Sequence, residues 1–342
     1  MTQAEDRRSL AGGDAGLART EEGGRALPAS LEETARLARG YFEAARAENT
    51  VSAYDSDLRD FATWCKVEAG GLSAMPASPE TVALYITDLA AGRGLKASTI
   101  RRRLAAISQL HKEAGFPSPA THEHVKDVLK GITRRHGSFQ EGADPILIGT
   151  VRRMLGPMER EKGPAAPRDS ALLLLGLAAG LRRSELSALA VEDLSFVEEG
   201  VVVLIRRSKT DQEGKGMRVG VPYGSHPETC PVRNLRAWLA VLGRDEGPLF
   251  CQVDRHGNLK EGGLTGQAIT RMIRKRARAA GLDGKRYSAH SLRAGLVTEA
   301  SAAGVSDKRI MDQTGHRSLP MVHRYAREAE LFMNNPAAFL GL

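Results

Sequence analysis

The sequence predicts a mainly helical protein of two domains that contains one small antiparallel β-sheet. Its length of 342 residues corresponds to about two domains of ~150 residues each. Apolar residues recur with helical spacing through most of the chain, with glycine and proline between the periodic segments. One short β-branched run, Gly200–Ile205, is typical of a strand, and a polar loop separates it from a second strand candidate.

The N-terminal part is expected to begin with a disordered tail and to continue as a helical domain. Residues 1–29 are rich in Gly, Ala, Glu and Arg and show no apolar period. Order is expected from Ser30, which has the spacing of a capping box with Glu33. The helical domain is predicted to span 30–134. Within it, helices are expected over 50–66, over 79–92 after the N-cap Ser78, and over 98–114, where Ile100, Leu104, Ile107 and His111 form one stripe.

A second domain is predicted after a polar linker at 135–144. It spans 145–328 and a short apolar segment, 329–342, follows it. The expected elements are helices over 146–155 and 168–179, strands over 200–205 and 217–222 with a loop at 208–216, and mostly helix from Pro227 onward.

Charge and cysteine content narrow the class of protein. The net charge of +8 and a pI near 9.5 favour a polyanionic partner, DNA or RNA before a membrane. No run of 18 apolar residues and no secretory h-region is present, so no membrane contact and a cytoplasmic location are expected. Three cysteines without CxxC spacing predict neither a disulfide framework nor a zinc site.

Four motifs carry residue types suited to chemistry. Arg182 follows a glycine at a helix end, and Lys209 lies at the tip of the predicted hairpin. His290 and Arg293 have the i, i+3 spacing of one helix face, and His316 is followed nine residues later by Tyr325. Taken singly, each has an ordinary interpretation as a surface cation, a capping or core histidine, or a packing tyrosine.

In this order, the motifs resemble those of the tyrosine recombinases, the phage integrase family of DNA strand-transfer enzymes. The family pattern is Arg, Lys on a hairpin, His-x-x-Arg, His or Trp, and then a nucleophilic Tyr. The matching positions are Arg182 with the acidic Glu185, Lys209, His290, Arg293, His316 and Tyr325. Segments 61–66, 96–112, 285–290 and 303–325 are similar to the Cre branch, which carries Trp at the position of His316.

The resemblance implies a covalent mechanism without metal or nucleotide cofactor. Tyr325 would attack the scissile phosphate to give a 3′-phosphotyrosyl link and a 5′-hydroxyl. His290 would act as general base and Lys209 as general acid. Arg182 and Arg293 would stabilise the charged transition state. In the same scheme His316 would hydrogen-bond a nonbridging oxygen, and Glu185 would support the site.

The resemblance also implies a C-shaped clamp around double-stranded DNA and a homotetramer on two duplexes with inverted-repeat sites. The candidate DNA-binding residues are Lys96, Arg101, Arg102, Lys112, Arg274, Lys275 and Arg286. A second basic cluster, on the helix near 271–278, comprises Arg271, Arg274, Lys275, Arg276 and Arg278. For these faces the alternative is simple solvation. The apolar segment 329–342 is expected to dock on a neighbouring subunit, and the alternative is packing on its own domain.

Two other functions fit parts of the sequence. One is a catalytically inactive DNA-binding regulator, which would have no need of Lys209 or Tyr325. The other is a type IB topoisomerase, which uses similar chemistry to relax DNA. The small helical domain and the apolar C-terminal segment favour recombination, in integration, excision or resolution, by a nucleoid-associated enzyme.

Overall fold

The computed structural model describes residues 29–44, 48–137, 142–208, 211, 216–330, 337 and 340. The chain divides into two compact units, residues 1–140 and residues 141–342. This division falls inside the predicted linker at 135–144. The mainly helical class with small antiparallel sheets is confirmed. Among the described residues, no helix is both long and apolar enough to cross a membrane.

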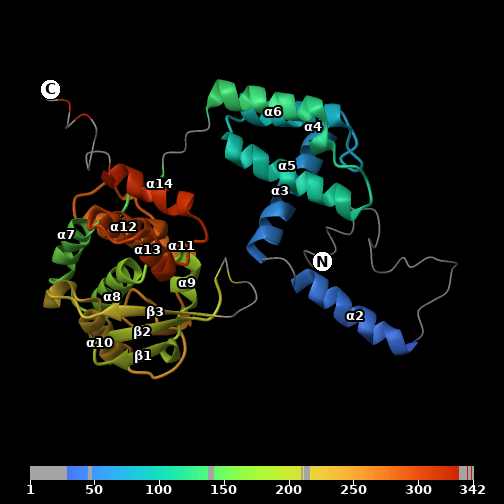
Figure 1. Ribbon diagram of the computed structural model, residues 1–342. Coiled ribbons are helices and arrows are strands. Elements are labelled where there is room, and N and C mark those ends of the chain that lie inside the picture. Colours follow the sequence, from blue (N-terminus) through green and yellow to red (C-terminus); the bar gives the residue numbers. More distant parts are fainter. Residues whose placement is uncertain are drawn as a thin grey trace. The chain divides into compact units, whose positions relative to one another are not determined.

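The N-terminal unit consists of helices that follow the predicted order (Figure 1). They are α2 (Ala29–Ala44), α3 (Glu48–Val67), α4 (Pro79–Ala91), α5 (Ala97–Glu113), the 3-10 turn Pro119–Thr121 and α6 (Glu123–His136). The first helix begins one residue before Ser30, and the carboxylate of Glu33 accepts from Arg36 in the next turn. The predicted capping box is therefore wrong. At α4 the prediction is confirmed, because the Ser78 side chain accepts from the backbone N–H of Thr81.

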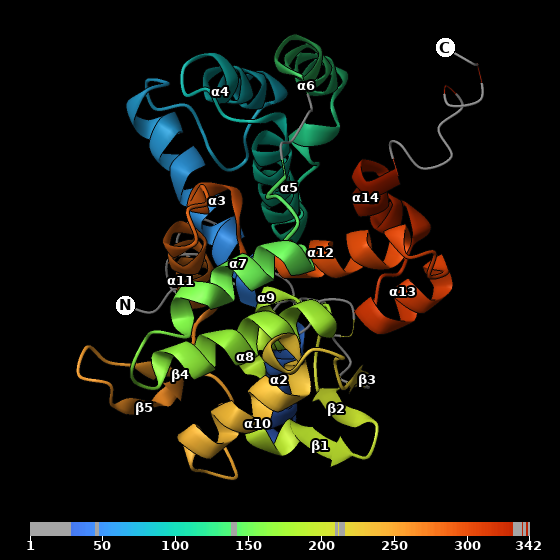
Figure 2. The ribbon, with the colours of Figure 1, turned by 90° about the vertical axis from the view of Figure 1, so that its left-hand side faces the viewer.

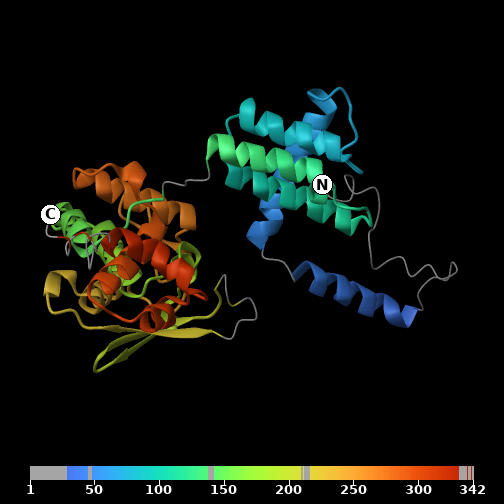
Figure 3. The same cartoon turned by 45° about the horizontal axis from the view of Figure 1, so that its top comes forward.

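The core of the N-terminal unit lies between α3, α4, α5 and α6. Figures 1 and 3 show α4, α5 and α6 side by side. Phe61 and Trp64 of α3 pack on the ring of Tyr85 in α4, with centroid distances of 4.8 and 5.3 Å. The predicted stripe of α5 is buried, and His111 within it accepts the N–H of Ala77 at Nε2.

The C-terminal unit is a larger helical body with two small sheets (Figures 1 and 2). Its helices are α7 (Ile148–Met158), α8 (Ala165–Ala178), α9 (Arg183–Ala188), α10 (Pro231–Leu242), α11 (Gly266–Ala279), α12 (Ala289–Ala302), α13 (Asp307–Thr314) and α14 (Leu319–Glu330). Short 3-10 turns occupy Val191–Asp193, Pro227–Thr229 and Gly284–Arg286. The predicted boundary between residues 328 and 329 falls inside α14.

The three-stranded antiparallel sheet has the order β1 (Leu194–Val197), β2 (Gly200–Ile205) and β3 (Met217–Pro222). The two predicted strands are confirmed at both ends. Alternate residues of β2 and β3, such as Val203 and Val219, are directly paired and face the core. Strand β1 was not predicted. The separate hairpin of β4 (Cys251–Val253) and β5 (Leu259–Gly263) was not predicted either, and it lies in the part of the chain after Pro227 where mostly helix was expected.

Helix α8 forms the centre of the C-terminal unit. Leu172, Leu173, Leu174 and Leu175 are all buried, because α7, α10 and α12 cover different sides of this helix. In Figure 1, α12, α13 and α14 lie on one side of α8 and the three-stranded sheet lies on the other.

One basic residue of α11 has a purely structural position. Arg276 is 1% exposed, and its Nε donates to Asp169 of α8 at 2.7 Å. Its Nη1 also contacts Glu161. The expectation that the basic cluster of this helix meets phosphate or water is therefore wrong for Arg276, because paired carboxylates hold it in the interior.

Helix α14 rests on its own small apolar cluster. Val297 of α12, Ile310 of α13 and Val322 of α14 are buried against one another, and Tyr325 packs at their edge. Figures 1 and 2 both show α14 lying against α12 and α13. This cluster is separate from the main core around α8.

Candidate active site

The first arginine of the site is positioned by the turn between α8 and α9. Gly180 ends α8 with φ +61°, a conformation that favours glycine, and Arg182 is the N-cap of α9. Glu185, in the first turn of α9, accepts the backbone N–H of Arg182 at 2.7 Å and its Nη1 at 2.6 Å. The predicted supporting role of Glu185 has this geometric basis: one carboxylate fixes both the main chain and the guanidinium of Arg182.

The second arginine is on α12 and is buried. Arg293 is 1% exposed; its Nη1 donates to the carbonyl of Gly180 at 2.8 Å and its Nε to Nε2 of His316 at 3.3 Å. Its Nη2 is buried and has no hydrogen-bond partner among the described residues. A buried, charged donor without a partner is costly, so this atom marks a position for an anionic acceptor.

Two glycine carbonyls hold the two arginines. Gly180 accepts from Arg293, and Gly315, the residue before His316, accepts from Nη2 of Arg182 at 3.1 Å. Both glycines follow helices with positive φ, +61° and +65°. The sequence analysis did not identify these carbonyl acceptors. A signal was present, because a glycine stands at the start of each of the two motifs, and glycine at such a position is typical of a helix end.

The tyrosine lies within the same site as the arginines. His290, on α12, contacts the phenol oxygen of Tyr325 through Nε2 in a hydrogen bond. The ring of Tyr325 is 5.6 Å from that of His290 and 6.2 Å from that of His316, centroid to centroid. Thr298 of α12 donates to the Tyr325 carbonyl at 3.2 Å and so fixes the main chain of α14 beside the site.

The site has a surplus of positive charge. Burial, followed by the charge of Arg182, lowers the pKa of Arg293 to about 10. Loss of hydration, followed by the charges of Arg293 and Arg182, lowers the pKa of His290, although the residue is exposed to solvent. Burial and the same arginines lower the pKa of His316 to about 4. An anion bound between the arginines would offset the repulsion among these positive charges.

Five predicted site residues, Arg182, His290, Arg293, His316 and Tyr325, are therefore brought together, with Glu185 behind them. Lys209 lies outside the described residues. Its flanking residues Ser208 and Asp211 pair as an antiparallel bridge, with the N–H of Asp211 donating to the Ser208 carbonyl at 3.1 Å. No group of three or more His, Cys, Asp or Glu side chains suited to a metal ion occurs in the described part of the chain.

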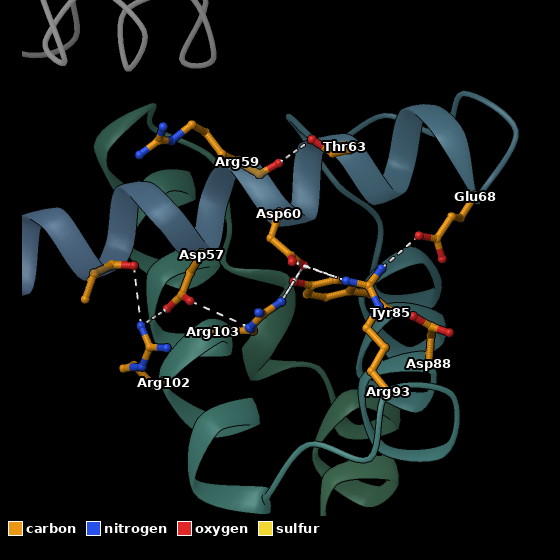
Figure 4. Close-up of polar contacts among 11 residues, drawn as sticks. Asp57, Arg59, Asp60, Thr63, Glu68, Tyr85, Asp88, Arg93, Arg102 and Arg103 are labelled. Carbon is orange, nitrogen blue, oxygen red and sulfur yellow. Dashed lines mark hydrogen bonds and ion pairs between the residues drawn. The ribbon is translucent and has the colours of Figure 1, made fainter.

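The candidate DNA-binding residues of the N-terminal unit are on the surface of α5 and its N-cap. Lys96, Arg101 and Lys112 are exposed, and Arg101 donates to Thr133 of α6 at 3.1 Å. Arg102 has a side chain 44% exposed, and its Nη1 pairs with Asp57 of α3 at 2.5 Å (Figure 4).

Neighbouring arginines in Figure 4 have structural partners instead. Arg103 lies between Asp57 and Asp60 and donates to the Tyr85 hydroxyl at 2.7 Å. Arg93 pairs with Glu68 at 3.0 Å and with Asp88 at 2.9 Å. Among these ion-paired arginines, Arg102 has the most exposed side chain, 44% against 30% for Arg93 and 15% for Arg103.

The candidate DNA-binding residues of the C-terminal unit differ in their contacts. Lys275 and Arg274 are exposed on α11, and Nε of Arg274 donates to the Tyr287 carbonyl at 3.2 Å. Arg286 is paired with Asp144 at 2.8 Å. Arg274 and Arg286 are thus held by partners of their own, a backbone carbonyl and a carboxylate.

Two arginines, the buried Arg293 and the half-buried Arg182, converge in this helical unit with two histidines and a tyrosine, a set of side chains suited to phosphoryl transfer to tyrosine. Residues 150–331 match the phage integrase family, and residues 39–115 match the N-terminal SAM-like domain of phage integrases. The chain belongs to the phage integrase family. It is a tyrosine-type site-specific recombinase, an enzyme that cleaves and rejoins DNA.

Individual relatives agree with this assignment. The chain is 38% identical over 313 residues to an integrase/recombinase XerD homolog of Selenomonas ruminantium, covering 90% of each protein. It is 28% identical to the recombinase Cre of Escherichia phage P1, covering 83% of this chain and 85% of Cre. The fold resembles that of the XerH site-specific recombinase bound to a palindromic difH substrate, with a TM-score of 0.64, 17% identity, and coverage of 98% of this chain and 94% of XerH.

Proposed function

We propose that Tyr325 is the nucleophile and that His290 is the base that removes its proton. The contact between Nε2 of His290 and the phenol oxygen carries this proposal. A phenol with a pKa of about 10 is protonated at neutral pH, so attack requires a nearby acceptor. The phenol oxygen bonds to the scissile phosphorus, the bond to the 5′-oxygen breaks, and the DNA 3′ end remains attached to Tyr325.

The arginines stabilise the charge that develops on the nonbridging oxygens. Arg293 offers the buried Nη2, and Arg182 is held by Glu185 and Gly315 with its side chain 14% exposed. Preorganised donors of this kind contribute about 3 kcal/mol each to transition-state stabilisation, by analogy with oxyanion holes. The leaving 5′-oxygen takes its proton from Lys209 in this scheme, since the β2–β3 hairpin that carries it belongs to the same unit. The charges that stabilise the transition state are thus supplied by side chains of the chain itself.

The substrate is proposed to be a double-stranded DNA site with inverted repeats, bound by the N-terminal unit 30–134 together with the catalytic unit. The palindromic substrate of XerH supports this form of site. A homotetramer on two duplexes, assembled in part by the segment 329–342, would bring two sites together. Most of that segment lies outside the described residues. Acting on such a substrate, the enzyme would work at the nucleoid.

Within the family, the features of the chain favour a Xer-like recombinase over membership of the Cre branch. Identity is 38% to the XerD homolog and 28% to Cre. In addition, His316 stands where the Cre branch has tryptophan. Integration, excision and resolution all use the same cleavage chemistry, and they differ in the arrangement of the DNA sites.

Trapping of the covalent intermediate tests the proposal. A nicked suicide substrate should give a covalent protein–DNA band with the wild-type enzyme and none with Tyr325→Phe, while site binding stays unchanged. Tyr223→Phe, at an exposed tyrosine of the same unit, is the matched control and should cleave normally.

A band of normal intensity with Tyr325→Phe would assign the nucleophile elsewhere. Absence of any band with wild-type protein would favour a binding-only regulator, and relaxation without recombinant product would favour a topoisomerase.

A further inference from the structure

An exposed arginine of the N-terminal unit is held by a buried carboxylate. Arg102 of α5 is exposed, whereas the side chain of Asp57, on α3, is 4% exposed. Nη1 of Arg102 is 2.5 Å from Oδ2 of Asp57, as Figure 4 shows, and 3.4 Å from the carbonyl oxygen of Ala53. The carboxylate thus lies inside the unit, while much of the guanidinium faces solvent.

The next residue of α5, Arg103, fixes the same carboxylate through its other oxygen. Nε of Arg103 is 3.6 Å from Oδ1 of Asp57, and its Nη1 donates to the hydroxyl of Tyr85 at 2.7 Å. One carboxylate oxygen therefore lies beside Arg103 and the other beside Arg102. Contacts at both oxygens restrict the rotation of the Asp57 carboxylate, so it is a fixed acceptor for Arg102.

The ion pair between Asp57 and Arg102 is not explained by its own stability. Burial raises the pKa of Asp57, although the charges of Arg102 and Arg103 oppose this rise. The cost of removing the carboxylate from water therefore exceeds the attraction that the two arginines supply. A charged side chain at position 57 is better explained by what it does to Arg102.

The contact with Asp57 leaves one edge of the guanidinium free. Nη1 is occupied, and Nε and Nη2 of Arg102 have no hydrogen-bond partner among the residues that the structure describes. These two nitrogens donate in parallel, a geometry that matches a pair of acceptor atoms. Ser98 and Ala105, one turn before and one turn after Arg102, are exposed and have short side chains, which leave room for a large partner.

We propose that Asp57 is a positioning residue for DNA recognition, which holds Nη1 of Arg102 so that the Nε–Nη2 edge is presented to a pair of acceptors on DNA. This inference rests on the proposed DNA-binding role of the N-terminal unit. Two acceptor pairs on a duplex fit the edge: O6 and N7 of a guanine in the major groove, and two oxygens of one phosphate. The pairing favours an oriented contact over attraction by charge alone, because the carboxylate offsets the charge of Arg102.

Binding of the full chain to a duplex that wild-type protein selects from a random-sequence pool tests the proposal. Asp57→Asn should weaken this binding about tenfold, within the range for one bidentate contact. It should have no effect when Arg102 is already alanine, because Asp57 acts through that residue. Asp60→Asn is the matched control, since this carboxylate belongs to the same network and contacts Arg103 and Arg93 instead. It should bind the selected duplex as wild type does.

A change of the opposite sign would overturn the proposal. If Arg102 acts through charge alone, Asp57→Asn removes a negative charge and should tighten binding to selected and random duplexes alike. An equal loss from Asp57→Asn with and without Arg102, or an equal loss from Asp60→Asn, would assign Asp57 a structural role only.

Arg102→Lys keeps the test decisive if Asp57→Asn does not fold. Lysine retains the positive charge but lacks the two parallel donors of the guanidinium. Under the proposal Arg102→Lys binds the selected duplex as weakly as Arg102→Ala. Wild-type affinity of the lysine variant would overturn the proposal.

Modified duplexes distinguish the two acceptor pairs. A 7-deazaguanine removes the N7 acceptor of one guanine, and a methylphosphonate removes one oxygen of one phosphate. The modification that weakens binding by wild-type protein but not by Arg102→Ala identifies the acceptor, and the absence of such a position for either modification would overturn the proposal. Failure of the proposed function itself would look different, because wild-type protein would then select no duplex from the pool.

Discussion

The Nε2 atom of His290 and the phenol oxygen of Tyr325 are in hydrogen-bond contact although the two residues are 35 positions apart. The contact exists because α14 returns along α12 and packs on it through Val322 and Val297. The proposed base and the proposed nucleophile therefore come from one chain, together with Arg182 and Arg293. A single protomer holds these four groups in one site.

Cleavage should accordingly occur in cis. Tyr325→Phe lacks the nucleophile and Arg293→Ala lacks the second arginine, so neither should form a covalent intermediate. A mixture of the two should remain inactive, because a tyrosine used by its own chain cannot reach the intact site of another subunit. The measurement is covalent trapping on a suicide substrate at equal protein concentrations. A band from the mixture would show that the tyrosine is donated between subunits.

The pH profile of cleavage should reflect the low pKa of His290. A histidine base is active when neutral, and the folded-state pKa lies below the ordinary value of 6.5. The cleavage rate should therefore stay level as pH falls through 6.5 and decline only at more acidic pH. Single-turnover rates between about pH 5 and 8 test this, with DNA binding measured at each pH. A decline centred at or above 6.5 would mean that His290 is not the base or that its surroundings differ in the complex.

Gly180→Ala should damage both stability and catalysis. Its φ of +61° is unfavourable for alanine, by about 1–2 kcal/mol. The added Cβ would also lie 2.6 Å from Leu296 and 3.0 Å from the methyl group of Thr314. Gly281→Ala is the matched control, since it has φ +73° and no atom within 4 Å of the added carbon. Denaturant unfolding of both variants separates the cost of backbone strain from the cost of the contacts with Leu296 and Thr314. An equal loss in the free energy of unfolding for the two variants would show that these neighbours of Gly180 move aside without cost.

The buried ion pair between Asp169 and Arg276 should be essential for folding of the catalytic unit. Asp169→Asn leaves Arg276 in the interior with less compensation, and such changes typically destabilise by about 3–5 kcal/mol. Glu33→Gln, at the exposed pair with Arg36 on α2, should leave the unfolding midpoint unchanged. Equal midpoints for the Asp169 variant and wild type would show that Glu161 alone can hold Arg276.

DNA binding should depend steeply on salt, with contributions from Arg101 and Arg102. If both meet phosphate, alanine at the two positions should reduce the slope of log K against log salt by about 1–2 units. Arg93→Gln is the control, because Arg93 is committed to Glu68 and Asp88. An unchanged slope and affinity for the double variant would mean that this face of α5 is only solvated.

Local patterns predicted the elements that have strong local signals. The strands Gly200–Ile205 and Met217–Pro222 were predicted to the residue, because a short β-branched run and its partner strand lie on either side of a polar loop. The segment Leu259–Gly263 contains lysine, glutamate and two glycines, and it forms a strand only through pairing with Cys251–Val253. Pairing between such segments is a tertiary effect that local propensity does not encode.

In the active site, too, some features were predicted from the sequence and others depend on the folded structure. Motif order predicted the side chains that meet, including Glu185 beside Arg182. The carbonyls of Gly180 and Gly315 were not predicted, because every residue has a carbonyl and only the folded turn selects these two. Thr314 was missed for a related reason: its hydroxyl lies 2.7 Å from Nδ1 of His316, a contact that exists only once α13 has ended. Arg276 was misassigned because a helical wheel does not show the carboxylates of other elements.

The apolar cluster beneath α14 separates the packing of the helix that carries Tyr325 from the packing around α8. Three buried side chains from three helices hold it, while the main core is organised around α8. Substitutions on α14 and α13 can therefore accumulate without requiring compensating changes among the leucines of α8. The helix that carries the proposed nucleophile can thus change its packing side chains while those around Arg182 stay the same.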